Sequence, residues 1–334
     1  MALPIVIIGT GASGIAAAKA IRKINSEVEL ILITNGDGYT YTKPKLSLIC
    51  KNDFDEQSLN IKNKKEIETT LSCSVLSNVQ VISINTEESY IALDNNQKIA
   101  FHSLVIASGA TPKKSTASLT STFFIHSYNC IEGYRKLLKR IKNAKSVAIV
   151  GAGVVGCEIA YDLSCKLEQV YLLCNKELIL KNTAPKSISN EIEHRLSQRN
   201  VKVLKNCEDI SYKKEKSTNE IHFSSNQEKK ILPVDLVIET IGIKPNVGFI
   251  EGSHININNG VIVNNQLKTN IDNIYALGDC ASYKGKTISN LQFINKCALI
   301  ISENIFDKKS KLEENNYNLF IKVGLPIINQ TFTI

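Results

Sequence analysis

The feature that most limits how this chain can fold is a glycine turn that occurs twice, 142 positions apart. The first copy, Gly9-Thr-Gly-Ala-Ser-Gly14, lies between the apolar run 4–8 and a stretch, 15–24, whose apolar residues recur at helical spacing. The second copy, Gly151-Ala-Gly-Val-Val-Gly156, has the same context. Each copy therefore predicts a strand, a tight turn and a helix, a unit that binds the pyrophosphate of a dinucleotide at the helix N-terminus.

Two such units in one chain predict two different dinucleotides. The most economical chemistry for that pair is hydride transfer from a nicotinamide to a flavin. A third strand-like run, 274–277, ends in Gly278-Asp279, and a carboxylate at the end of a strand can accept a hydrogen bond from the ribityl chain of a flavin. The alternative for Asp279 is a cap on the following helix.

The residues after the second strand of each unit bear on the choice of nucleotide. Neither strand ends in the acidic residue that is expected to hold the adenosine ribose. Thr34 and Asn35 follow the first strand and can form hydrogen bonds without carrying charge. Lys176 and Glu177 follow the second, where the lysine can meet a 2′-phosphate and the glutamate disfavours one. The sequence favours NADH and does not exclude NADPH.

Charge and composition limit the partners. Forty basic residues against 32 acidic ones give a net charge of +8, spread in short clusters that are read as solvated faces or as a docking face for an acidic protein. No nucleic acid is expected, because no recognition helix or platform of aromatic and basic residues accompanies the charge. No membrane association is expected either, since no apolar run approaches the roughly 20 residues of a membrane helix.

The cysteine and histidine positions indicate the redox compartment of the protein and whether it has a metal site. Nine cysteines without a recognisable export signal argue for a reducing compartment and thus for the cytoplasm. They form no Cys-x-x-Cys pair and match no zinc spacing, and the five histidines are scattered, so no metal site is predicted.

The chain resembles the FAD-dependent pyridine nucleotide-disulfide oxidoreductases, and among them the rubredoxin–NAD reductases, over roughly residues 4–325. Four stretches carry the likeness: 33–47, with its Thr-Lys-Pro-x-Leu-Ser; 151–164, with its Gly-Cys-Glu; 242–246; and 274–281. The Thr-Lys-Pro-x-Leu-Ser and Gly-Cys-Glu stretches are more specific than the glycine turns themselves.

The resemblance implies an α/β fold with two doubly wound Rossmann-like domains, one inserted in the other. The FAD domain would be split into 1–112 and 239–305, and the NAD(P)H domain would occupy 113–238. Residues 306–334 would be the remnant of a C-terminal domain that is largely missing relative to the family. We expect a monomer or a weak dimer.

The resemblance also implies the residues that bind the two nucleotides. They come from the glycine turns, the strand ends and later loops: Gly9, Thr10, Gly11, Ala12, Gly14, Thr34, Asn35, Lys43, Val81, Ser108, Gly109, Gly151, Gly153, Val155, Gly156, Glu158, Gly242, Asp279, Leu291 and Lys322. By this likeness 9–12 would hold the FAD pyrophosphate and 151–156 the NADH pyrophosphate.

Several implied roles are more specific. Thr34 and Asn35 would hold the FAD adenosine, and the backbone of Val81 would contact the adenine. Asp279 would bind the ribityl hydroxyls, with Leu291 and Lys322 close to the pyrimidine end of the flavin ring.

The two implied catalytic residues are Lys43 and Glu158. Lys43 would lie beside the flavin ring and stabilise negative charge on the reduced flavin, and Glu158 would pair with Lys43 and orient it.

The function implied is hydride transfer from NADH to FAD, followed by single-electron transfer to a small acidic carrier, with rubredoxin as the first candidate. The chain lacks the redox-active cysteine pair of the disulfide reductases. An NADH oxidase or peroxidase of the same fold, using Cys50, is one alternative, and a ferredoxin reductase is another. The remaining alternatives are a non-catalytic redox-sensing nucleotide-binding protein and a degenerate remnant without function.

Overall fold

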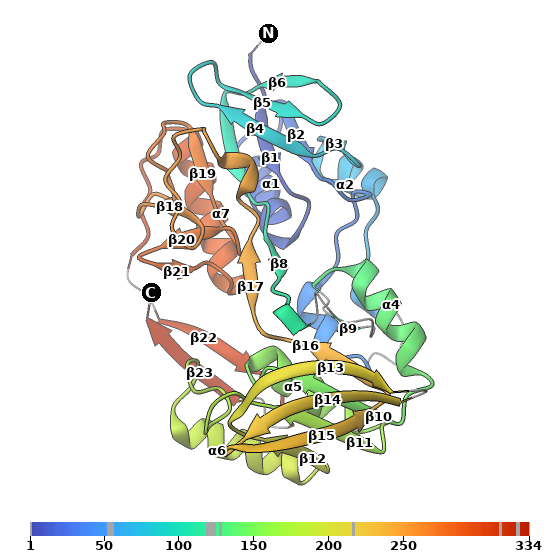
Figure 1. Ribbon diagram of the computed structural model, residues 1–334. Coiled ribbons are helices and arrows are strands. Elements are labelled where there is room, and N and C mark those ends of the chain that lie inside the picture. The colour runs from blue at the N-terminus through green and yellow to red at the C-terminus, as the bar shows by residue number, and fades with distance from the viewer. Residues whose placement is uncertain are drawn as a thin grey trace.

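Two parallel five-stranded sheets form the frame of the molecule, one in each half of Figure 1. The computed structural model describes residues 2–51, 57–117, 125–126, 129–215, 218–313, 316–324 and 328–333. The strands of the first sheet, in spatial order, are β19 (Ile274–Ala276), β7 (Ser103–Ile106), β1 (Ile5–Ile8), β2 (Leu30–Ile33) and β3 (Ser74–Leu76). Those of the second are β12 (Val201–Leu204), β11 (Gln169–Leu173), β10 (Ser146–Val150), β16 (Leu236–Glu239) and β9 (Ile125–His126).

Each glycine turn joins a central strand to a helix, as the sequence predicts. β1 leads into α1 (Ala12–Ile24), and β10 leads into α5 (Val154–Leu163). All four residues of β1 are buried, which is typical of a parallel strand covered on both faces. The predicted fold class, an α/β protein with two doubly wound units, is confirmed.

The remaining helices pack around these sheets. α1 lies against α7 (Leu291–Ile305) in the upper half of Figure 1, and α5 lies against α6 (Lys186–Ser197) in the lower half. Among the described residues, the other helices include α2 (Lys64–Leu71), α4 (Ile131–Ile141) and the 3₁₀ helices η1 (Lys43–Ser47), η2 (Gln57–Leu59) and η3 (Gly248–Ile250). The apolar core around α5 also takes in η1 and the end of the chain, through Leu46, Ile321 and Val323.

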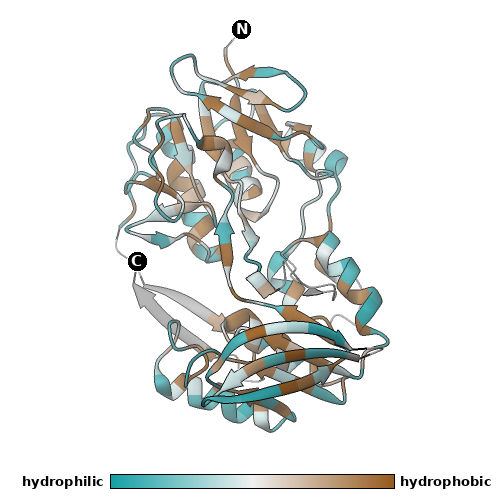
Figure 2. Cartoon of the chain, viewed as in Figure 1, coloured by the Kyte–Doolittle hydropathy of each residue, from teal (hydrophilic) through white to brown (hydrophobic). Residues whose placement is uncertain are grey.

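Small sheets complete the two halves. In the lower half, a three-stranded meander is formed by β13 (Cys207–Glu215), β14 (Thr218–Ser225) and β15 (Glu228–Val234). Hydrophobic and hydrophilic bands succeed one another along these strands in Figure 2. Tyr212, Ile221 and Phe223 pack on the second sheet, so one face of the meander is buried, while the lysines of β13 and β15 remain exposed.

Three further small sheets lie in the upper half, and a hairpin ends the chain. The first comprises β4 (Val81–Asn85), β5 (Tyr90–Leu93) and β6 (Lys98–Ala100), and the second β18 (Val261–Val263), β20 (Ala281–Tyr283) and β21 (Lys286–Thr287). The third pairs β8 (Ala110–Pro112) with β17 (Ile243–Pro245), where the chain crosses between the halves (Figure 1). The hairpin is β22 (Asn316–Ile321) with β23 (Ile328–Thr333).

The division into an FAD domain and an NAD(P)H domain stays a prediction. The crossing strands β8 and β17 lie next to the proposed divisions at 112/113 and 238/239. Within the proposed C-terminal piece, residues 314–315, 325–327 and 334 lie outside the described residues. No helix in the described part of the chain is long and apolar enough to cross a membrane.

A matched pair of glycine substitutions tests the close contact between helix and strand. A Cβ on Gly14 would collide with the carbonyl oxygen of Gly9, whereas a Cβ on Gly11 would have no atom within 4 Å. We expect Gly14→Ala to lower the free energy of unfolding by about 3 kcal/mol, and Gly11→Ala to change it by less than about 1 kcal/mol. Urea denaturation measures both, and equal stabilities of the two variants would contradict the steric argument.

Candidate functional site

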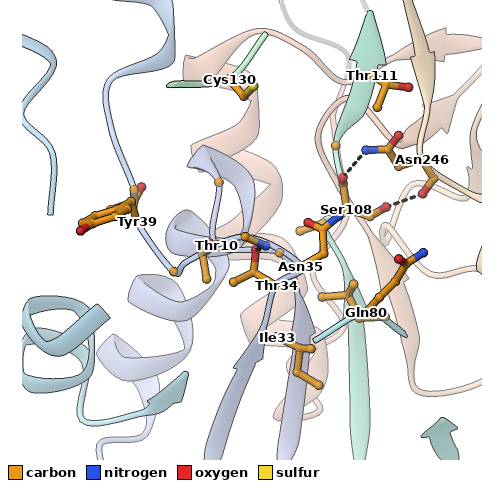
Figure 3. Close-up of a pocket in the computed structure, with 18 of the residues that line it drawn as sticks. Thr10, Ile33, Thr34, Asn35, Tyr39, Gln80, Ser108, Thr111, Cys130 and Asn246 are labelled. Carbon is orange, nitrogen blue, oxygen red and sulfur yellow. Dashed lines mark hydrogen bonds between the residues drawn. The ribbon is translucent and has the colours of Figure 1, made fainter. Parts of the chain in front are cut away.

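A cavity of about 700 Å³ lies at the carboxyl ends of β1 and β2. Its lining combines the first glycine turn with the segment after β2, the beginning of β4 and the residues after β7 (Figure 3). This is where an open α/β sheet binds its ligands, because the strands end there and the helix N-terminus faces the opening. Of the predicted FAD-binding residues it takes in Gly9, Thr10, Gly11, Ala12, Thr34, Asn35, Lys43, Val81, Ser108 and Gly109.

The backbone around the first turn is shaped for close approach by a ligand. Gly9 has a φ of +120°, and a Cβ there would collide with the carbonyl oxygen of Ala107. Cβ atoms built on Gly11 and Gly109 meet nothing within 4 Å, so open space borders the backbone at both positions. These features fit a pyrophosphate held by backbone amides at the start of α1.

The segment after β2 forms the next part of the wall. The Thr34 hydroxyl accepts a hydrogen bond from the Gly36 N–H at 3.3 Å, and the Thr34 N–H donates to the Leu76 carbonyl at 2.9 Å. Thr34 and Asn35 lie close to Thr10 in Figure 3, with Gln80 near them. The carboxyl end of β2 therefore carries neutral hydrogen-bonding groups into the cavity.

Lys43 lies at the other end of this wall, at the first residue of η1. Its Nζ is 3.2 Å from Asp279 Oδ2, although 236 positions separate the two residues. The Lys43 side chain is 34% exposed and that of Asp279 is 20% exposed. An ammonium group that lines the cavity is thus held by the carboxylate that follows β19.

Glu158, on the first turns of α5, has different partners. It is only 4% exposed and accepts hydrogen bonds from the Ser47 hydroxyl at 2.6 Å and the Lys322 N–H at 3.0 Å. Lys322 Nζ lies 3.0 Å from the same carboxylate and also donates to the Pro44 carbonyl at 2.7 Å.

The predicted pairing of Lys43 with Glu158 is therefore corrected. A buried carboxylate needs a countercharge and hydrogen-bond donors, and Lys322 supplies both at once from its ammonium group and its backbone. Lys43 pairs with Asp279 instead. Both ion pairs nevertheless involve η1. Lys43 is the first residue of this 3₁₀ helix, and Ser47, which donates a hydrogen bond to Glu158, is its last.

The second glycine turn lies outside the lining of the large cavity. Gly151 has a φ of +111°, and its carbonyl accepts a hydrogen bond from the Thr240 hydroxyl at 2.7 Å. Gly153 borders open space, and Val155 is 52% exposed. The other predicted residues outside this lining are Gly14, Gly156, Glu158, Gly242, Asp279, Leu291 and Lys322.

Several residues that line the cavity carried no signal in the sequence. Asn129 and Cys130, immediately before α4, line the cavity without having been indicated by any motif (Figure 3 labels Cys130). Asn246 Nδ2 donates to the Ser108 carbonyl at 3.0 Å, and the Ser108 hydroxyl donates to the Asn246 carbonyl at 2.7 Å. Asn246 belongs to the 242–246 stretch of the family likeness, but nothing in that stretch indicates Ser108 as its partner.

Cys50 has the environment of a structural thiol. It is 4% exposed, and burial, followed by the charge of Asp162, raises the pKa of its thiol. All nine cysteines are free. Since the thiolate is the reactive form, this environment disfavours the alternative in which Cys50 is a redox nucleophile.

Comparisons with known proteins agree with this arrangement. Residues 3–296 match the family model described as pyridine nucleotide-disulphide oxidoreductase. A rubredoxin-NAD(+) reductase of Acinetobacter baylyi is 29% identical over 289 residues, which cover 84% of this chain and 73% of the relative. A nitric oxide reductase FlRd-NAD(+) reductase of Klebsiella pneumoniae is 29% identical over 309 residues, covering 92% and 80%.

Solved structures show the same fold. The NADH:rubredoxin oxidoreductase of Clostridium acetobutylicum superposes with a TM-score of 0.79 at 22% identity, covering 97% of this chain and 80% of that one. A ferredoxin reductase of Rhodopseudomonas palustris gives a TM-score of 0.86, also at 22% identity, covering 96% and 80%.

A double-mutant cycle tests the ion pair at Glu158. Glu158→Gln and Lys322→Met should each lower the free energy of unfolding by about 2 kcal/mol, because each leaves a poorly compensated partner. The double variant should lose less than the sum, with a coupling of about 1 kcal/mol or more. The half-exposed pair of Lys43 and Asp279 is the control, with a coupling below about 1 kcal/mol. A coupling of zero for Glu158 and Lys322 would contradict the pair.

Thiol labelling tests the environment of Cys50. A raised pKa lowers the thiolate fraction at neutral pH, so iodoacetamide should modify Cys50 at least about tenfold more slowly than the exposed Cys165. Peptide mass spectrometry measures both rates, and labelling in urea is the control in which the difference disappears. Equal rates in the native protein would favour a reactive Cys50.

Proposed function

Because this chain belongs to the pyridine nucleotide-disulphide oxidoreductase family, we propose that it passes electrons from NADH through FAD to a small acidic carrier protein, with rubredoxin as the first candidate. The observation that carries the proposal is the cavity at the first glycine turn, which has Lys43 in its wall. η1, on which Lys43 stands, contacts the helix of the second glycine turn through Ser47 and Glu158. Two nucleotide-binding units therefore meet where electrons would pass between them.

The cavity and the neighbouring Asp279 offer groups that would hold FAD. Gly9, Gly11 and Ala12 would hold the pyrophosphate through backbone amides at the positive end of α1. Thr34 and Asn35 would bind the adenosine, with the backbone of Val81 at the adenine, and Asp279 would accept hydrogen bonds from the ribityl hydroxyls. Bound FAD supplies a ring that accepts a hydride from NADH and releases electrons one at a time.

Lys43 would act on the charge that develops at the flavin. Lys43 lines the cavity, and Asp279 holds its ammonium group at a distance of 3.2 Å. A fixed positive charge in a partly desolvated site stabilises nearby negative charge, and this effect is the usual reason for placing a lysine there. Leu291, at the start of α7, and Lys322 would lie towards the same ring.

The second glycine turn would take NADH. Open space at Gly153 and the exposed Val155 leave room for a pyrophosphate at the N-terminus of α5, beside Gly151 and Gly156. After β11, the exposed Glu177 carboxylate lies 2.9 Å from Lys181 and is negatively charged at neutral pH, as any exposed carboxyl group is. A charged Glu177 disfavours a 2′-phosphate, which favours NADH over NADPH.

The carrier protein is inferred from charge and from the relatives. The chain carries a net charge of +8, which suits an acidic partner, and its relatives include a protein named rubredoxin-NAD(+) reductase. We infer a cytoplasmic monomer or weak dimer that needs neither a membrane nor nucleic acid. A ferredoxin as carrier is the second candidate, because a ferredoxin reductase shares the fold.

The first experiment is a visible spectrum of the purified protein before and after anaerobic NADH. We expect a flavin absorption band that bleaches with NADH, and faster bleaching with NADH than with NADPH. Protein that stays colourless and takes up no added FAD would contradict the proposal.

Substitution of Lys43 tests its role. Lys43→Met should retain FAD and slow reduction by NADH about 10–100-fold, because the fixed positive charge is lost. Lys65→Met, a change of an exposed lysine on α2 outside the cavity lining, is the matched control. Anaerobic stopped-flow spectroscopy measures the rates, and equal rates for the two variants would remove Lys43 from the mechanism.

A comparison of acceptors tests the partner. Reduced protein should pass electrons to rubredoxin faster than to a plant-type ferredoxin or to peroxide, and the rate should fall as salt rises because opposite charges steer the encounter. Faster transfer to ferredoxin would select the second candidate, and rapid turnover with peroxide would favour the peroxidase alternative.

A further inference from the structure

Helix α5 carries two buried carboxylates on one face. Glu158 is 4% exposed and Asp162 is 8% exposed, and their spacing of four residues places them one helical turn apart. Both accept hydrogen bonds from the same stretch of chain, residues 43–51, which comes from the other glycine-turn unit. The family resemblance implies a role for Glu158 and none for Asp162.

Asp162 binds backbone rather than side chains. Its Oδ2 accepts from the Cys50 N–H at 2.6 Å, and its Oδ1 accepts from the Lys51 N–H at 3.2 Å. Burial raises the pKa of this carboxyl group, and the amide groups of 49–51 oppose that shift. A carboxylate that takes two consecutive amides fixes both the position and the direction of the backbone to which they belong.

The stretch held in this way is the one that bears Lys43. A 3₁₀ helix of five residues has poor hydrogen-bond geometry of its own, so the position of η1 depends on its anchors. Before η1, the Thr42 N–H donates to the Leu59 carbonyl at 2.8 Å. Within η1, Ser47 and the Pro44 carbonyl are bound by Glu158 and Lys322. After η1, Asp162 is the side-chain anchor.

We propose that Asp162 is a positioning residue for Lys43. By holding the amides of Cys50 and Lys51, Asp162 fixes the Lys43-bearing 3₁₀ helix to α5, the same helix whose N-terminus would bind NADH. Helix α5 would then determine the position of the nicotinamide relative to the Lys43 ammonium group beside the flavin. The catalytic consequence rests on the proposed function, whereas the anchoring rests on the contacts of Asp162 alone.

The experiment uses Asp162→Asn and Asp162→Ala, with Glu168→Gln as the matched control. Glu168 is an exposed carboxylate of the same half, and its side chain pairs with Lys145 across 3.7 Å. The Asn variant keeps the shape of the side chain, so it remains informative if the Ala variant fails to fold. Circular dichroism establishes that each variant is folded before any rate is compared.

The first measurement is hydrogen exchange at the amides of Cys50 and Lys51 in the full chain without added nucleotides. Loss of the carboxylate should speed exchange at these two amides about tenfold or more, while the central strands β1 and β10 keep their protection. The Glu168→Gln control should exchange as the parent does. Unchanged exchange at both amides in the Asn and Ala variants would overturn the proposal.

The second measurement is the anaerobic rate of flavin reduction by NADH. Misplacement of Lys43 should slow the limiting rate about tenfold while the NADH concentration at half-saturation changes less than about twofold. Faster amide exchange combined with an unchanged rate would overturn the positioning role and leave the proposed function intact. A parent protein that NADH does not reduce would overturn the proposed function, and the exchange experiment would still decide whether Asp162 anchors the 43–51 stretch.

Discussion

The close contact between a helix and the strand before it, made twice at the glycine turns, is the constraint on which the rest of this structure depends. Gly14 lies against the carbonyl of Gly9, and Gly156 lies against the carbonyl of Gly151, and neither contact leaves space for a Cβ. The contact directs the N-terminus of each helix to the carboxyl edge of its sheet. The large cavity opens at that edge in the first unit, and open space borders Gly153 at the same place in the second.

The two units are joined by polar contacts as well as by chain crossings. Glu158 and Asp162 place buried negative charge on α5. The hydrogen-bond donors and the ammonium group that stabilise this charge belong to segments other than the second five-stranded sheet and its helices. Ser47 and the amides of Cys50 and Lys51 come from the first unit, and Lys322 comes from the end of the chain. Because an uncompensated buried carboxylate is costly, these contacts specify how the two units meet.

Much of the fold follows from local rules that act within a few residues. The glycine spacing, the apolar strand before each turn and the helical period after it identify both units and their parallel sheets. The same rules place Thr34 and Asn35 at the end of β2, where the cavity wall contains them. The meander at 207–234 follows less directly from local rules, because a polar stretch shows where strands turn more clearly than how many strands pair.

The sequence alone determined the two glycine-turn units, their α/β fold and the family likeness, since each depends on neighbouring residues and on backbone sterics. Only the tertiary structure decided the charge pairs. Lys43 and Asp279 are 236 positions apart, and Glu158 and Lys322 are 164 positions apart, so no spacing rule connects either pair. The partner of a charged side chain is chosen by which groups the folded chain brings within about 4 Å and by which of them burial deprives of water. The packing of segments that are distant in the sequence therefore determines the ion pairs, and in this structure Glu158 pairs with Lys322 and not with Lys43.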